Sequence, residues 1–439
     1  MKTIRETIVD ILVEIEKSQS YVQLILKKYL EQFEILDRKF ITEVVNGTIQ
    51  HQITLDYYIN TLSKTPVNKM KPFIKQLIRM SAYQLLFLDK IPTPAIINEA
   101  VNIVKRRKMT NLSGFVNGIL RNLDRQKDNI VLPTEPIECF SVKYSMPAWI
   151  IQMWNNVYNH AEIEKICSSL NRRGKVCGRV NNLKTSKEQL KILLNRENID
   201  ITDGKFIEES FYLNNVTSIG NVSSFKEGLW TVQDESAMLV SKVLNPQKGD
   251  IILDVCAAPG GKSTHIAQLI QNEGQIISTD IYEHKLELIQ KNADRLELSC
   301  ITPVLNDGTI FKEAWENKFD KILLDVPCSG LGILSKKPDI KYKRTLSDIH
   351  ELVKIQKKLI ENNIKYLKPN GILVYSTCTI SKLENEDIVE YILQNKNMAV
   401  EKLINLPEIL ESKQNYVQIL PYLVDTDGFF IAKFKKVGN

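Results

Sequence analysis

The chain has 439 residues, 43% of them hydrophobic and 25% charged, and a formal net charge of +6. This length predicts two or three domains. No apolar run reaches the ~18 residues of a membrane helix, and the charged start MKTIRETIVDILVEIEK lacks the apolar core of a signal peptide. We therefore expect a cytoplasmic protein that does not contact a membrane.

The positive charge is concentrated in one part of the chain. Residues 51–200 contain 23 lysines and arginines against 12 acidic residues, whereas residues 1–50 and 201–439 carry net charges of −1 and −4. Such a concentration indicates a polyanionic partner beside a nearly neutral domain.

The cysteines and histidines argue against a disulfide framework or a metal site. The seven cysteines are scattered without a C-x-x-C pair, and the five histidines show no metal-ligand spacing. In a reducing compartment we therefore expect free thiols and no bound metal.

Apolar residues at helical spacing dominate the first 125 residues and predict an all-helical bundle. This pattern covers residues 6–17, 37–53, 73–88 and 95–107, and the polar stretch 125–136 is typical of a linker. The last of these helices ends in a basic run. We expect Lys105, Arg106 and Arg107 to contact nucleic-acid phosphates, although a basic helix end can also simply be solvated.

Residues from about 140 to 235 mix both patterns and predict a small α+β module. Strand patterns cover residues 176–183, 206–213 and 228–233. Thr185 and Glu188 have the spacing of a capping box and predict a helix start there.

From about residue 236 onward, strand and helix patterns alternate. The strand patterns cover residues 251–255, 275–279, 301–305, 321–326, 371–377, 417–423 and 428–436. Near-continuous apolar strands that alternate with helices predict an α/β, Rossmann-like domain with a mostly parallel, seven-stranded sheet. The last two strands are close in sequence and are expected to pair antiparallel.

The first of these strands ends in a turn of small residues, DVCAAPGGKST (254–264), ahead of a helix start. Ligands bind at such strand ends in parallel sheets. A phosphate-binding P-loop is rejected, because Cys256 stands where that motif needs glycine. We expect the cofactor contacts to come from Cys256, Ala257, Ala258, Pro259, Gly260, Gly261 and Lys262.

Acidic residues follow the next two strands. Asp280 comes 19 residues after Gly261, which is the right place for a carboxylate that accepts hydrogen bonds from ribose hydroxyls. Asp307 stands where a carboxylate can accept from an adenine amino group. Either acid alone could be an ordinary turn residue. Together with the small-residue loop they indicate an adenosine ligand, and S-adenosylmethionine fits best.

Two further strand ends carry a cysteine, in LLDVPCSGLG (323–332) and LVYSTCT (373–379). A thiolate that adds to C6 of cytosine turns the ring into an enamine whose C5 can accept a methyl group. That chemistry needs a nucleophilic cysteine, a group at N3 and a base, and Asp325, Cys328 and Cys378 are the candidates. The residues alone leave open which cysteine attacks.

These motifs, followed by Glu384, Asn385 and Glu386, resemble those of the RNA cytosine-5 methyltransferases. The resemblance covers nearly the whole chain, because residues 144–154 and 231–237 are similar to that family's RNA-binding part and residues 36–49 and 97–123 to a NusB-like domain.

The resemblance implies a NusB-like RNA-binding domain at residues 1–130, a linker and small α+β RNA-binding module at 131–235, and an S-adenosylmethionine-dependent methyltransferase domain at 236–439. The implied reaction is methyl transfer to C5 of a specific cytosine in 16S ribosomal RNA, cytosine 967 in that family. We expect the protein to act as a monomer.

The resemblance also implies roles for single residues. Cys378 is the nucleophile, Cys328 assists breakdown of the adduct, and Asp325 faces both cofactor and base. Lys262 closes the cofactor loop and also reaches the RNA base, and Arg179 and Asn181 contact RNA.

Other functions remain open. DNA cytosine-5 methyltransferases use the cysteine of the Pro-Cys motif as nucleophile, but the N-terminal helical bundle argues against that class. A non-catalytic NusB-like RNA-binding or antitermination factor would leave the strand-end cysteines and the cofactor loop unexplained. A cytosine in another RNA is a further possible substrate.

Overall fold

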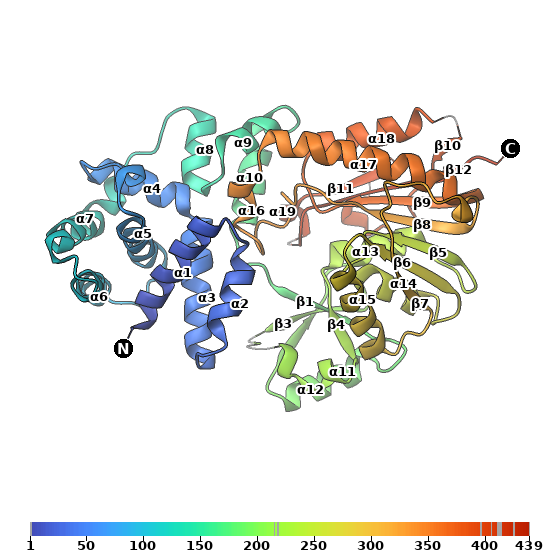
Figure 1. The fold of residues 1–439 in the computed structure, drawn as a ribbon, viewed down its shortest axis with the longest axis horizontal. Helices are drawn as coiled ribbons and strands as arrows, with labels where there is room; N and C mark the ends of the chain where they lie inside the picture. Colours follow the sequence, from blue (N-terminus) through green and yellow to red (C-terminus); the bar gives the residue numbers. More distant parts are fainter. Residues whose placement is uncertain are drawn as a thin grey trace. The chain divides into compact units, whose positions relative to one another are not determined.

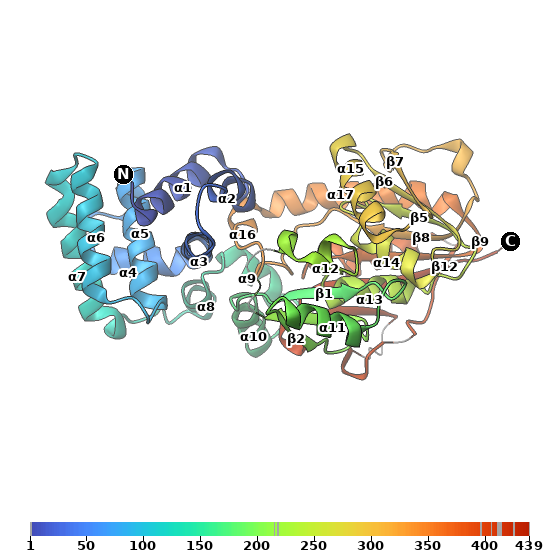
Figure 2. The same cartoon turned by 90° about the horizontal axis from the view of Figure 1, so that it is seen from below.

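The computed structural model describes residues 2–214, 216, 219–395, 397–404, 406–410, 415–424 and 426–438. The chain forms two compact units (Figures 1 and 2). The helical unit consists of Met1–Asn171 and Lys336–Lys343, and the sheet unit consists of Arg172–Ser335 and Arg344–Asn439. The division into three domains with boundaries near 130 and 235 stays a prediction.

The described part of the helical unit contains helices and no strands, which confirms the predicted bundle. Its α-helices are α1 (Ile4–Ser18), α2 (Val22–Leu30), α3 (Ile35–Gln50), α4 (Gln52–Leu62), α5 (Pro72–Phe87), α6 (Thr93–Arg106), α7 (Ser113–Gln126), α8 (Pro136–Tyr144), α9 (Ala148–Asn155), α10 (His160–Leu170) and α16 (Ile340–Lys343). Three short 3₁₀ turns connect them in the described residues, at Val67–Lys69, Thr110–Leu112 and Lys127–Asn129.

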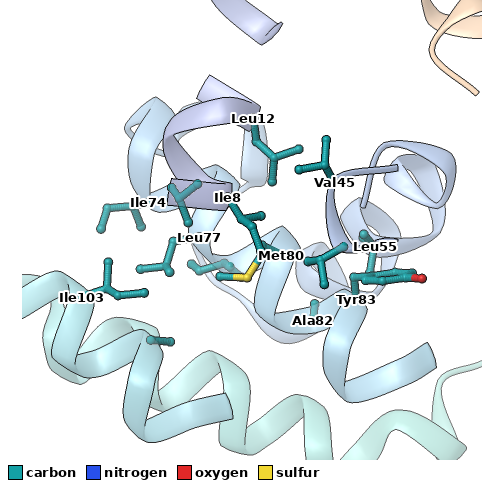
Figure 3. Packing of buried hydrophobic residues seen from close by; sticks show 14 of the residues in the cluster. Ile8, Leu12, Val45, Leu55, Ile74, Leu77, Met80, Ala82, Tyr83 and Ile103 are labelled. Atoms are coloured by element: carbon teal, nitrogen blue, oxygen red, sulfur yellow. The ribbon is translucent and has the colours of Figure 1, made fainter. Parts of the chain in front are cut away.

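Helix α5 lies at the centre of this unit, and most of its side chains are buried. Leu77 and Met80 of α5 contact the cluster that includes Ile8 and Leu12 of α1 and Val45 of α3 (Figure 3). Full burial of one such side chain contributes about 1.5–3 kcal/mol. The periodic apolar residues of the sequence therefore form one continuous core.

A short segment from the second half of the sequence completes the helical unit. Lys341 of α16 is 1% exposed, and its ammonium donates to the carbonyl oxygen of Gln50 at 2.8 Å. Asp339 accepts from the backbone N–H of Val22 and from Lys343. Burial lowers the pKa of Lys341 to about 7. The sequence pattern gave no sign of this long-range docking.

The sheet unit begins with a small antiparallel sheet, which confirms the α+β module. Its described strands have the order β2-β3-β1-β4. The elements are β1 (Val176–Val180), α11 (Lys187–Arg196), β2 (Asp200–Asp203), β3 (Ser210–Asn214), a 3₁₀ turn (Ile219–Asn221), α12 (Ser223–Lys226) and β4 (Trp230–Val232).

Two local expectations in this module are corrected. The capping box is formed by Ser186 and Gln189, one residue later than the predicted pair Thr185 and Glu188, because the same spacing occurs twice in a row. The strand predicted at 206–213 begins only at Ser210. The preceding backbone N–H groups of residues 205–207 donate to the buried carboxylate of Glu235 and are not available to a strand partner.

The rest of the sheet unit is a Rossmann-like α/β fold. In the described residues its sheet has eight strands in the order β10-β12-β9-β8-β5-β6-β7, with β11 also paired to β12. The strands are β5 (Ile251–Val255), β6 (Gln275–Asp280), β7 (Ile301–Leu305), β8 (Phe319–Asp325), β9 (Leu367–Thr377), β10 (Met398–Val400), β11 (Tyr416–Ile419) and β12 (Phe429–Lys436). The helices are α13 (Glu235–Leu244), α14 (Gly261–Leu269), α15 (Glu283–Leu296), α17 (Leu346–Tyr366), α18 (Glu386–Leu393) and α19 (Pro421–Val424), with 3₁₀ turns at Glu313–Trp315, Lys382–Glu384 and Glu408–Leu410.

The strand pairing agrees with the predicted mostly parallel sheet, but the predicted number of seven strands is wrong. Strands β9, β8, β5, β6 and β7 are parallel, and β11 and β12 pair antiparallel as expected. The additional strand is β10, whose three residues pair with the end of β12 and are too few to produce a period in the sequence.

Helices cover both faces of the large sheet (Figure 1). Ile252 of β5 packs on the face of α13, α14 and α15, and Leu253 packs on the face of α17 and α18. Burial on both faces explains the near-continuous apolar strands. Because β5, β6, β7, β8 and β9 are parallel, their carboxyl ends meet at one edge, where the predicted cofactor-binding and catalytic residues lie. In the described ranges, no helix has both the length and the apolar character needed to span a membrane.

Candidate active site at the carboxyl ends of the strands

The loop from Asp254 to Lys262, here called the cofactor loop, connects β5 to α14. Cys256 and Gly260 have positive φ angles of 61° and 94°. A Cβ on Gly260 would lie 3.3 Å from Ile289, so only glycine fits there without strain. Helix α14 starts at Gly261 with no side-chain cap, which leaves its first backbone N–H groups for a ligand.

Buried polar groups lie beneath the cofactor loop. Ser263 donates to Asp254 at 2.5 Å, and Ser278 donates to Ser263 at 2.9 Å. Burial, with the nearby Asp325 charge, raises the pKa of Asp254 to about 7. Burial also raises the pKa of Cys256 to about 12, so this thiol lines the loop in its protonated form.

Asp280 and Asp307 follow the adjacent strands β6 and β7. Asp280 is 5% exposed, and its carboxylate has long contacts of 3.2 Å to the N–H of Tyr282 and 3.4 Å to Lys285. Asp307 is exposed and accepts from the N–H and hydroxyl of Thr309. Asp280 is therefore a buried acceptor with only weak partners, whereas Asp307 also stabilises its own turn. A small-residue loop, an uncapped helix start and this carboxylate fit an adenosine ligand.

Lys262 and Asp325 form an ion pair between the cofactor loop and the end of β8. Their Nζ and Oδ2 atoms are 2.6 Å apart, and the hydroxyl of Ser376 donates to Oδ1 at 2.8 Å. The ammonium of Lys262 also lies over the ring of Phe429. Burial alone would lower the pKa of Lys262, but the Asp325 carboxylate outweighs burial and the pKa is raised. Lys262 is therefore a fixed positive charge at this edge.

The sulfur atoms of Cys328 and Cys378 lie 3.3 Å apart, and both side chains are half-buried. The two residues follow the adjacent strands β8 and β9. The hydrogen bond to Cys378, together with burial, raises the pKa of Cys328 well above its ordinary value. Cys328 thus keeps its proton beside the other sulfur.

The RNA contacts that the resemblance implies for Arg179 and Asn181 stay predictions, and in this structure both side chains are 0% exposed. Arg179 of β1 donates to the carbonyl oxygen of Gly261, to Thr264 and to Gln268, and it also contacts Gln233. Its burial lowers the pKa to about 9. These contacts connect the small sheet to the first turns of α14.

Asn181 has a similar internal role. Its amide donates to the carbonyl oxygens of Gly228 and Leu296, which lie in the small module and at the end of α15. The sequence does not show whether an arginine and an asparagine are buried or exposed, so these internal hydrogen bonds could not be predicted from the motif.

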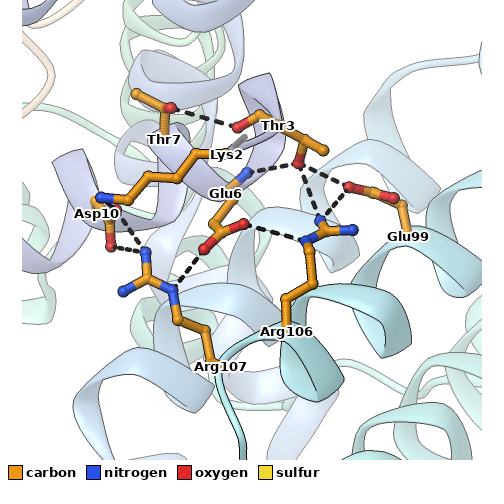
Figure 4. A network of polar contacts seen from close by, with 8 residues as sticks. All are labelled: Lys2, Thr3, Glu6, Thr7, Asp10, Glu99, Arg106 and Arg107. Carbon is orange, nitrogen blue, oxygen red and sulfur yellow. Dashed lines mark hydrogen bonds and ion pairs between the residues drawn. The ribbon is translucent and has the colours of Figure 1, made fainter.

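Arg106 and Arg107, for which we expect phosphate contacts, lie in a network of carboxylates. Arg106 pairs with Glu6 and Glu99, and Arg107 pairs with Glu6 and Asp10 (Figure 4). These pairs connect α6 to α1 and neutralise both charges. Lys105 and Arg106 are exposed and Arg107 is partly buried, but Lys105 is not part of this carboxylate network, so the predicted phosphate contact now rests mainly on Lys105.

Sequence reasoning gave no role to the residues directly beneath the cysteines. Ser329, Thr379 and Glu384 are buried and bonded to one another there. Their position next to the cysteine motifs was the only available signal. Among the described residues, no group of three or more His, Cys, Asp or Glu side chains is arranged to hold a metal ion.

Comparisons with known proteins agree with this architecture. Family models match the chain as the NusB family at residues 2–125, the RsmF/B-like ferredoxin-like domain at 146–220 and the 16S rRNA methyltransferase RsmB/F at 241–435. A solved structure of NSun6 from Pyrococcus horikoshii with SFG is 26% identical, with a TM-score of 0.58 over 66% of this chain and 98% of that one.

Two curated relatives are similar along nearly their whole length. The chain is 37% identical to the probable ribosomal RNA small subunit methyltransferase B of Bacillus subtilis, over 99% of each chain. It is 34% identical to the corresponding protein of Synechocystis sp., over 97% of this chain and 98% of that one. The family models match the helical unit, the small module and the Rossmann-like fold in this order along the sequence. The chain belongs to the ribosomal RNA small subunit methyltransferase B family.

Proposed function

We propose that the protein transfers a methyl group from S-adenosylmethionine to C5 of a cytosine in 16S ribosomal RNA through a covalent cysteine adduct. The observation that carries this proposal is the 3.3 Å separation of the Cys328 and Cys378 sulfurs at the sheet edge that also holds the cofactor loop. The names of the curated relatives support a ribosomal RNA substrate.

The cofactor loop and Asp280 are the residues that would hold S-adenosylmethionine. When bound, this cofactor supplies the methyl group. The backbone from Ala257 to Gly261 lets a ligand approach closely, and the carboxylate of Asp280 accepts from the ribose hydroxyls. Asp307 would accept from the adenine. The SFG-bound relative supports this assignment, because SFG is an analogue of S-adenosylmethionine.

The two cysteines and the Lys262–Asp325 ion pair have different roles at the cytosine base. The Cys378 thiolate forms a bond to C6, and the ring gains negative charge that a donor must stabilise at N3. The ammonium of Lys262, hydrogen-bonded to Asp325, is a donor within reach of this edge. After methylation a base takes the C5 proton, the electron pair of the C5–H bond re-forms the C5–C6 double bond, and the S–C6 bond breaks with its electron pair returning to Cys378 as a thiolate. Cys328 assists this last stage: once Cys378 is bonded to C6, the hydrogen bond that keeps Cys328 protonated is gone, so Cys328 can lose its proton to water and take the one from C5.

The exact nucleotide belongs to the same proposal. The resemblance favours cytosine 967. Bisulfite sequencing of ribosomal RNA from cells with and without the protein should show one 16S cytosine that is protected only when the protein is present. Cells that carry Cys378→Ala serve as the control and should lack the mark. A protein-dependent protected cytosine in another RNA would show that this RNA is the substrate. Identical protection patterns in cells with and without the protein would contradict the reaction. A monomeric state and a cytoplasmic location stay predictions.

A further inference from the structure

The residues that follow the two cysteines are bonded to each other and to one buried carboxylate. Ser329 and Thr379 come directly after Cys328 and Cys378, and their hydroxyl oxygens are 2.6 Å apart. Glu384 is 0% exposed and accepts from the N–H of Ser329 at 2.8 Å and from its hydroxyl at 2.5 Å. Because the Ser329 proton goes to Glu384, Thr379 must donate to Ser329. A continuous hydrogen-bonded chain thus connects the two cysteine loops.

Asn385, the next residue, holds the loop of Cys378 from both sides. Its side-chain oxygen accepts from the hydroxyl of Thr377 at 2.6 Å, and its amide donates to the carbonyl oxygen of Thr379 at 3.1 Å. Thr377 and Thr379 flank Cys378 in the sequence. The residues on both sides of this cysteine are therefore bonded to one side chain, Thr377 through its hydroxyl and Thr379 through its backbone carbonyl.

Glu384 is itself anchored to the sheet and to a helix. Gln356 of α17 donates to Glu384 at 3.2 Å and to the carbonyl oxygen of Pro327 at 3.0 Å. The hydroxyl of Tyr375 in β9 donates to the backbone oxygen of Glu384 at 2.6 Å. A buried carboxylate is costly unless several donors satisfy it, and here they come from the loop of Cys328 and from α17, while Tyr375 of β9 holds the backbone of the same residue.

We propose that Glu384 and Asn385 are positioning residues that set the distance between the two cysteine sulfurs. The inference rests on the proposed function, in which both sulfurs act on one pyrimidine ring. Neither residue contacts the substrate, since both are 0% exposed. A misplacement of about 1 Å in such a pair can lower the rate about 10²-fold.

The sulfur separation can be measured without any RNA. Diamide oxidises two nearby thiols to a disulfide and is itself reduced to the hydrazine, which takes up both protons and both electrons. The product requires the sulfurs to close from 3.3 Å to about 2.05 Å. Mass spectrometry of a non-reducing digest of the full chain gives the rate at which the Cys328–Cys378 peptide pair forms.

Two conservative substitutions should slow this reaction. Glu384→Gln keeps the shape but places an amide where Ser329 needs an acceptor, and Thr379→Val removes the hydroxyl that bonds to Ser329. We expect each to lower the disulfide rate at least tenfold, and Thr379→Ser to restore the wild-type rate. The matched control is Glu209→Gln, a buried carboxylate of the same unit that pairs with His265 and Lys242, and it should keep the wild-type rate.

The same variants are then compared in methylation of 16S RNA. Positioning predicts a lower kcat with an unchanged KM for RNA in Glu384→Gln. Unchanged disulfide rates in both Glu384→Gln and Thr379→Val would overturn the inference, whatever their methylation activity. If the two variants form the disulfide more slowly but the wild-type chain itself methylates no RNA, the positioning role is supported and the proposed function is contradicted. If Glu384→Gln does not fold, the Thr379→Val and Thr379→Ser pair decides.

Discussion

The guanidinium of Arg179 lies 3.0 Å from the carbonyl oxygen of Gly261, so a strand of the small sheet is bonded to the first residue of α14. Arg179, for which the resemblance implies an RNA contact, therefore lies directly behind the cofactor loop. Changes in the small module should therefore affect cofactor binding as well as folding.

Arg179→Met should weaken S-adenosylmethionine binding and lower the free energy of unfolding by about 1–3 kcal/mol, because it leaves the buried oxygens of Gly261, Gln233 and Gln268 without a donor. Its RNA affinity should keep the wild-type dependence on salt. Lys105→Ala provides the contrast, since an exposed phosphate contact contributes about 0.7–0.9 to the slope of log affinity against log salt. A reduced slope in Arg179→Met, measured by filter binding, would show that the arginine reaches RNA after all.

Lys341 should make the stability of the helical unit depend on pH. Its pKa is about 7 in the folded chain and 10.5 ordinarily, so between these values the unfolded chain binds a proton that the folded chain lacks. The free energy of unfolding should therefore rise with pH across this window. Urea unfolding at about pH 7 and pH 9 measures the rise. Lys341→Met should be more stable at neutral pH and lose this part of the slope, and an equal slope in both proteins would count against the buried amine.

Asp280→Asn should weaken S-adenosylmethionine binding. A lost charged acceptor for the ribose hydroxyls costs roughly 1–3 kcal/mol, or about 5- to 150-fold in affinity. Isothermal titration calorimetry measures the change, with the exposed neighbour Glu283→Gln as control. Equal affinities for all three proteins would remove Asp280 from the cofactor site.

Much of the catalytic half could be predicted because its strands are buried on both faces. Strands β5, β8 and β9 appear in the sequence as apolar runs; the cofactor loop follows β5, and the cysteine motifs follow β8 and β9. Adjacent parallel strands then place Cys328 and Cys378 together. The three-residue strand β10 and the four-residue strand β2 escaped detection, since such short segments show no period.

The missed features depend on contacts between distant parts of the chain. Lys341 belongs to the helical unit although it comes 13 residues after Cys328 of the Pro-Cys motif in the sheet unit, and no local pattern marks this. The RNA contact of Arg179 is implied by the family resemblance alone, and the sequence does not reveal that this side chain is buried. Glu384 was seen beside a motif, but its role depends on Ser329, 55 residues earlier.

In the proposed reaction Cys378 attacks the base and Cys328 acts afterwards. Purified variants are incubated with S-adenosylmethionine and 16S RNA and run on a denaturing gel, which preserves a covalent protein–RNA bond. Cys328→Ala should accumulate a slow-migrating protein–RNA band, because its adduct forms but does not resolve. Cys378→Ala should give no such band and no methylation. A band from Cys378→Ala and none from Cys328→Ala would reverse the assignment, and no band from either variant would contradict the thiolate mechanism itself.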